Sequence, residues 1–206
     1  MNTTNGNPPQ AAVQAAVLRF LSLCLLYPEP DLLAAQQAAA QATGQDWAIA
    51  LAARFAATDL EALQIEHTRL FINNQAGVPC PPYESAYVDG QLLTATTAAV
   101  GRFYAAWGLE QDQETPDYLP TELQFAAYLL ALSAEAEEED QRAAAQAALE
   151  QFNTQHLSRW LEPFARDLQT HAQQDAYRVL AEHLFQVATK GLRAGSGGQE
   201  IPPRER

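Results

Sequence analysis

Apolar residues recur three and four positions apart through most of this chain, the spacing that places side chains on one face of an α-helix. No stretch shows the alternation of apolar and polar residues that is typical of a β-strand. The pattern therefore predicts an all-α fold, a helical bundle of about 8–10 helices. The expected helices cover residues 10–27, 30–42, around 47–55, around 60–71, 91–107, a segment following residue 117, and 142–152, 155–171 and 175–192.

Residues with special backbone preferences predict where several helices begin and end. Gly44 suits a helix C-terminus, because glycine readily adopts the left-handed conformation that follows the last turn. Thr58 and Glu61 have the spacing of a capping box. Asp117 and Ser85 are expected to be N-caps, because short polar side chains accept hydrogen bonds from the free N–H groups of a first turn.

Breaks in the helical pattern divide the chain into segments. Residues 1–9 have almost nothing to bury and are expected to be a disordered tail. An N-terminal helical lobe with a proline-rich loop is expected over residues 10–108, and the polar residues 109–117 are expected to be a hinge. A C-terminal helical lobe is then expected over residues 118–192, followed by a flexible tail over residues 193–206. The predicted architecture is two helical lobes joined by a hinge.

The charge balance restricts the classes of partner. The formal net charge is −13, from 25 acidic and 12 basic residues, which argues against binding to nucleic acid or to anionic membranes. The N-terminus lacks the features of a signal peptide, and the longest apolar run is too short to span a bilayer. A cytoplasmic protein without stable membrane association is expected, in which Cys24 and Cys80 are free thiols.

Common catalytic and metal-binding motifs are absent from the sequence. It contains no HExxH, no ExxH, no GxxxxGK[ST], no GxGxxG and no GxSxG. His67 lies on the apolar face of its helix, so a buried structural histidine is expected there rather than a ligand. No nearby base is indicated for Cys80. We therefore expect no catalytic residues, no metal site and no cofactor.

Two segments stand out from the alanine-rich background. The first begins with EHTRLF at residues 66–71 and continues, through a loop rich in proline, to PPYESAY at residues 81–87. The second is PDYLPTELQF at residues 116–125. Because prolines fix φ and lack an N–H, the loop before Tyr83 is stiff and cannot be helical.

Together, these segments resemble the TorD/DmsD family of redox-enzyme maturation chaperones. That family has an E-aromatic-x-R-L-F helix end, a P-P-aromatic-E-S-x-Y loop and a P-D-H-L-x-x-E-L-x-F helix start, and the resemblance extends over roughly residues 13–192. Two positions depart from it: Tyr118 stands where the family usually has His, and His67 stands where it favours an aromatic residue such as Tyr.

The resemblance implies an all-helical, cytoplasmic, non-enzymatic chaperone. Such a chaperone binds the twin-arginine signal peptide, and often the body, of a molybdopterin oxidoreductase catalytic subunit, and holds it until the molybdenum cofactor is inserted and export can follow. It would be a monomer or a domain-swapped dimer. Carried over by position, the expected signal-peptide-binding residues are Pro81, Pro82, Tyr83, Glu84, Ser85, Tyr87, Pro116, Asp117, Tyr118 and Glu122.

The chemistry of these residues is compatible with that role. Their carboxylates could bind guanidinium groups bidentately, and their tyrosines could stack on guanidinium planes or line an apolar groove. The structural alternative is that Glu84 and Asp117 are helix caps and that Tyr87 is a core residue. Glu66 and Arg69, three positions apart, are expected to form an intrahelical pair or a structural clasp. The competing function is a helical protein-interaction module or accessory subunit of a redox complex.

Overall fold

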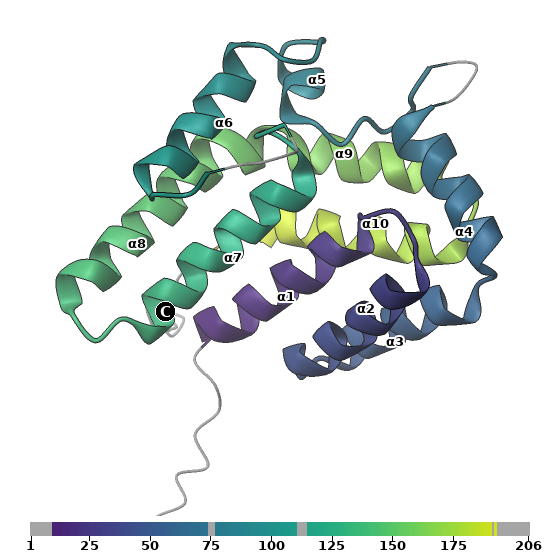
Figure 1. Ribbon diagram of the computed structural model, residues 1–206, viewed down its shortest axis with the longest axis horizontal. Helices are drawn as coiled ribbons and strands as arrows, with labels where there is room; N and C mark the ends of the chain where they lie inside the picture. Colours follow the sequence, from purple (N-terminus) through teal and green to yellow (C-terminus); the bar gives the residue numbers. More distant parts are fainter. Residues whose placement is uncertain (1–9, 74–76, 111–114, 191, 193–206) are drawn as a thin grey trace, which may run out of the picture.

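A computed structural model describes residues 10–73, 77–110, 115–190 and 192, and within these ranges the fold is all-α, as predicted (Figure 1). The only β-type pairing in the described ranges is an isolated bridge between Tyr83 and Tyr118. The elements are α1 (Gln10–Cys24), α2 (Pro30–Thr43), α3 (Asp46–Ala57), α4 (Leu60–His67), the π-helical turn η1 (Thr68–Ile72), α5 (Glu84–Val88), α6 (Ala95–Ala106), α7 (Leu119–Glu135), α8 (Glu139–Phe152), the π-helical turn η2 (Asn153–Leu157), α9 (Ser158–His171) and α10 (Asp175–Lys190).

Several helix ends differ from the predicted ones. Gly44 does follow α2 in the left-handed conformation, with φ +64°. The predicted cap at Thr58, however, is wrong: Asp59 is the N-cap of α4, and its carboxylate accepts a hydrogen bond from the N–H of Ala62 at 3.0 Å. Thr58 instead donates its hydroxyl hydrogen back to the carbonyl of Arg54.

Two boundaries move because local backbone geometry overrides the apolar pattern. α1 ends at Cys24 rather than near residue 27, since the N–H groups of Leu25 and Leu26 bond three residues back in a tight turn. α6 begins at Ala95 rather than near residue 91, because Leu93 adopts a left-handed φ of 59°, which no α-helix contains.

The helices pack around a shared core of apolar side chains. α1 lies along α7, α7 along α8, and α9 along α10, while α2 and α3 form an adjacent antiparallel pair (Figure 1). The largest fully buried side chains of this core include Trp160, Tyr177, Phe20 and Phe152. Cys24 and Cys80 are buried free thiols, as expected. No helix in the described ranges is both long enough and apolar enough to cross a membrane.

The predicted division into two lobes stays a prediction. α1 and α7 lie on opposite sides of the predicted hinge in the sequence, yet they pack closely against each other. Residues 111–114 of that hinge, and the two predicted tails over residues 1–9 and 193–206, fall outside the described residues. The described part of the hinge ends in Pro116 and Asp117, which lie directly beside α5, and this contact brings the two sequence motifs together.

Candidate functional site

The two motif segments are joined by a short antiparallel bridge between Tyr83 and Tyr118. The N–H of Glu84 donates to the carbonyl of Asp117 at 3.0 Å, and the N–H of Leu119 donates to the carbonyl of Pro82 at 2.9 Å. The two tyrosine rings lie side by side, with centroids 5.4 Å apart and planes tilted by 35°. The bridge therefore fixes the proline loop against the start of α7.

On one side of this bridge lies a cavity of about 550 Å³, which we call the tyrosine pocket. Its walls come from the turn after α1, from the end of α4 with η1, from the proline loop, and from the first turns of α7. Two of its apolar side chains are well exposed, Tyr27 at 43% and Ile72 at 55%. The lining residues are Leu26, Tyr27, His67, Phe71, Ile72, Pro82, Tyr83, Tyr118, Pro120, Thr121 and Gln124.

The tyrosine pocket presents a neutral, largely aromatic surface. None of its lining residues is Asp, Glu, Lys or Arg. Burial lowers the pKa of His67 to about 4, so its imidazole is neutral at pH 7. Nε2 of this ring lies 3.2 Å from the carbonyl oxygen of Leu25, to which it donates as the protonated nitrogen, and the ring packs edge-on against Tyr27 and Phe71. Such a surface suits an apolar ligand better than a charged one.

The Glu84 carboxylate lies on the other side of the bridge and is fully buried. Its neighbour Tyr83 has extended backbone, with φ −133° and ψ 131°, so the two side chains project in opposite directions. Glu84 Oε2 lies 2.8 Å from Nδ1 of His156, and Oε1 lies 3.6 Å from a guanidinium nitrogen of Arg159. The carboxylate thus ties α5 to η2 and α9.

Asp117 caps a different helix from the one expected. Its carboxylate, in a side chain only 1% exposed, accepts a hydrogen bond from the N–H of Ser85 at 2.9 Å, so it caps α5 across the bridge. The N-cap position of α7 is occupied by Tyr118, without a side-chain cap. Ser85 is not an N-cap either, because Tyr83 precedes α5 in that position and the buried Ser85 hydroxyl has no hydrogen-bond partner.

Glu122 and Tyr87 are also held in the interior. Glu122 is fully buried and accepts a hydrogen bond from Trp160 Nε1 at 3.2 Å. Burial, and then the charge of Glu84, raises the pKa of Glu122 well above its usual value. The half-buried Tyr87 donates its hydroxyl hydrogen to Asp167 at 3.0 Å and packs against Trp160.

The expected binding residues therefore divide into separate groups. Pro82, Tyr83 and Tyr118 line the tyrosine pocket. The carboxylates of Glu84, Asp117 and Glu122 do not line it, because all three are buried in the interior. Pro81 and Pro116 are half-buried backbone elements of the two loops; the carbonyl of Pro116 accepts a hydrogen bond from Tyr104 at 3.0 Å. A direct contact of any of these residues with a peptide stays a prediction.

The Glu66–Arg69 pair is both an intrahelical pair and a clasp, as expected. Arg69 donates from Nε to the Glu66 carboxylate at 2.8 Å and from its terminal nitrogen to the carbonyl of His171 at 2.7 Å. Glu66 also accepts hydrogen bonds from the N–H groups of Gln173 and Gln174, just before α10. The clasp fixes η1, whose last residues form one wall of the tyrosine pocket.

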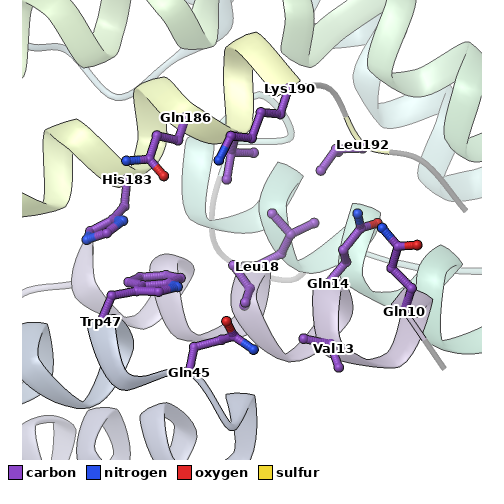
Figure 2. A pocket seen from close by; sticks show the side chains of 12 residues that line it. Gln10, Val13, Gln14, Leu18, Gln45, Trp47, His183, Gln186, Lys190 and Leu192 are labelled. Atoms are coloured by element: carbon purple, nitrogen blue, oxygen red, sulfur yellow. The ribbon is translucent and has the colours of Figure 1, made fainter. Parts of the chain in front are cut away.

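Another cavity, of about 400 Å³, lies between the start of α1, the α2–α3 junction and the end of α10 (Figure 2). Figure 2 shows the indole of Trp47 lying against the imidazole of His183, with ring centroids 3.9 Å apart. The lining contains four glutamines, and it shares no residue with the tyrosine pocket or with the two motif segments. The tyrosine pocket is the candidate site because both motifs form its walls.

These features define an all-helical protein whose two motif loops are joined beside an uncharged aromatic pocket. The model of the nitrate reductase delta subunit family matches residues 31–166, a range that includes both motif segments. The chain belongs to this family, in agreement with its resemblance to TorD-type maturation chaperones.

A solved structure supports the fold. The crystal structure of a candidate redox enzyme maturation protein from Archaeoglobus fulgidus is similar, with a TM-score of 0.67 and 23% sequence identity. The similarity covers 92% of this chain and 99% of that chain. No match was found among curated proteins.

Three of the eleven lining residues of the tyrosine pocket, Leu26, Tyr27 and Ile72, lie outside the two motif segments. Tyr27 and Ile72 contribute its most exposed apolar surface. The only signals for them in the sequence are positional: Tyr27 directly precedes Pro28, and Ile72 follows the RLF of the first motif.

Proposed function

We propose that this protein is a cytoplasmic, non-catalytic chaperone for a molybdopterin oxidoreductase catalytic subunit. It would bind the twin-arginine signal peptide and the apo form of that subunit, support insertion of the molybdenum cofactor, and release the subunit for export. The observation that carries the proposal is the bridge between Tyr83 and Tyr118, which unites the two motifs of the family beside an open aromatic pocket.

The tyrosine pocket fits the apolar part of a signal peptide. A twin-arginine peptide has two guanidinium groups followed by an apolar stretch, and the uncharged lining offers its aromatic rings to that stretch. Burying apolar area contributes about 25 cal/mol per Å², so covering Tyr27 and Ile72 together with peptide side chains would supply much of the affinity.

The arginines require a different contact, because the tyrosine pocket offers no carboxylate. The net charge of −13 would attract a basic peptide over long range and increase its association rate. Specific pairing would need Glu84, Asp117 or Glu122, and in the described conformation each of these already has a partner within the protein.

The cofactor in this proposal belongs to the client rather than to the chaperone. Among the described residues there is no group of three or more His, Cys, Asp or Glu side chains that could hold a metal ion. In this proposal the chain's own residues bind and retain a peptide.

Calorimetric titration tests the proposal. The purified protein would be titrated with the twin-arginine signal peptide of a molybdoenzyme from the same genome, and with versions in which both arginines become alanine or the apolar stretch becomes serine. Binding in the micromolar range or tighter, weakened by the serine changes, would support the proposal. If no signal peptide from the molybdoenzymes of that genome bound, the alternative of a module that recognises folded protein would be favoured.

A further inference from the structure

We propose that Arg159 occupies, from within the chain, the position of a client guanidinium against Glu84, and that the client's arginine displaces it. This inference rests on the proposed function and deepens it, because it assigns a specific carboxylate to the arginines. It also identifies Arg159 as a residue that sets the affinity for them.

The two oxygens of the Glu84 carboxylate have unequal partners. Oε2 is 2.8 Å from Nδ1 of His156, which is itself buried. Oε1 is buried and has no hydrogen-bond partner within the described structure. Its nearest cation is the guanidinium of Arg159 at 3.6 Å, a distance too long for a hydrogen bond. One oxygen of a fully buried carboxylate is thus left without a close partner.

Arg159 reaches this oxygen from the protein surface. Its side chain is 47% exposed, whereas the side chain of Glu84 is fully buried. The same guanidinium nitrogen also donates to the carbonyl of Gln155 at 3.3 Å, which is a long bond. A guanidinium can therefore approach Oε1 from solvent, and the one that does so is weakly held.

A client arginine would form a stronger interaction with the Glu84 carboxylate than Arg159 does. Guanidinium–carboxylate hydrogen bonds are shortest and strongest near 2.7–2.9 Å, and buried ones are screened less than exposed ones. Displacing Arg159 returns its charge to water at little cost, because the side chain is already half exposed. The Glu84 carboxylate is already buried before the exchange, so no new buried anion has to be created for the client.

A second carboxylate lies within electrostatic range of Arg159. Asp89 is exposed after α5, and its pKa is lowered first by a hydrogen bond from Thr94 and to a smaller degree by the positive charge of Arg159. Glu84 and Asp89 thus provide two acidic groups near Arg159, one for each guanidinium group of the peptide.

The test compares Arg159→Gln with Arg166→Gln. Both arginines are on α9, so each variant removes one positive charge from the same helix. Arg166 is 66% exposed, pairs with Glu162 at the surface and lies over the ring of Phe185, away from Glu84. We expect Arg159→Gln to bind the twin-arginine peptide five- to tenfold more tightly than wild type. The alanine-substituted peptide should bind both variants alike. Equal or weaker binding of the twin-arginine peptide by Arg159→Gln, relative to Arg166→Gln, would overturn the inference.

A second measurement separates this inference from the proposed function. The imidazole signals of His156, followed by NMR in Arg159→Ala, should shift saturably when N-acetyl-arginine methylamide is added, and should not shift with the lysine analogue. An absence of shift would refute the guanidinium site even if the wild-type protein bound signal peptides. Failure of wild type to bind any signal peptide would refute the proposed function, and the His156 result would then decide the guanidinium site separately.

Discussion

Replacing Asp117 by alanine should destabilise the protein, because its buried side chain forms a hydrogen bond that links the two motif segments. Its carboxylate accepts the N–H of Ser85, the second residue of α5, and it is only 1% exposed. The residue therefore caps a helix that lies across the bridge from its own segment. Removing the carboxylate leaves a buried N–H without a partner.

The magnitude follows from the kind of bond that is lost. Hydrogen bonds to charged groups contribute about 1.5–3 kcal/mol to stability, and loss of an N-cap costs about 0.5–2 kcal/mol. The two ranges describe the same contact and overlap near about 2 kcal/mol, so they are not added. We expect Asp117→Ala to lower the free energy of unfolding by about 2 kcal/mol. Asp117→Asn should cost less than about 1 kcal/mol, because the amide oxygen can still accept the bond.

Urea denaturation followed by circular dichroism at 222 nm would measure both variants. Glu182→Ala, a change at an exposed position within α10, is the control and should stay within about 0.5 kcal/mol of wild type. If Asp117→Ala also stayed within that limit, the capping role would be refuted. An Asn variant as unstable as the Ala variant would show that charge, rather than the hydrogen bond, matters at this position.

Three further predictions concern the walls of the tyrosine pocket. Glu66→Ala should lower the free energy of unfolding, measured in urea, by about 3 kcal/mol. The change removes the carboxylate partner of Arg69 and the acceptor for the N–H groups just before α10. A loss below about 1 kcal/mol would contradict the clasp. His67 stays neutral in the folded state while the unfolded state takes up a proton below about pH 6.5, so its contribution to stability falls as the pH falls from 6.5 towards 4. Wild type should thus lose about 2 kcal/mol more than His67→Gln between pH 7 and pH 5, and parallel profiles would refute this. Tyr118→Ala should weaken binding of the signal peptide about tenfold by loss of aromatic contact area, whereas Gln186→Ala in the other cavity should not; equal effects would place the peptide elsewhere.

The helices could be predicted from the sequence because most of them bury a single face, so that apolar spacing reports them directly. Their ends were predicted less well. Leu92 and Leu93 continue the apolar pattern, yet they are 53% and 71% exposed, and the left-handed φ of Leu93 delays the start of α6. The predicted break after Phe152 is absent, because the π-helical turn η2 carries α8 into α9.

The candidate site could be predicted in part. The motif residues indicated which loops matter, and the structure brings those loops together at the Tyr83–Tyr118 bridge. The sequence could not show that Tyr83 faces the pocket while Glu84 faces the core, because this depends on backbone geometry and on His156, a partner distant in the chain. Nor could it show that Tyr27, from the turn after α1, completes the pocket.

Photo-crosslinking tests the central claim most directly. A twin-arginine signal peptide carrying a benzophenone side chain within its apolar stretch would be irradiated with the purified protein, and the attachment sites would be mapped by mass spectrometry. The account predicts attachment to Tyr27, Ile72 or Tyr118 in the tyrosine pocket, at a yield that exceeds that of a scrambled peptide. Attachment mainly around Trp47 and His183, or a yield equal to that of the scrambled peptide, would contradict it.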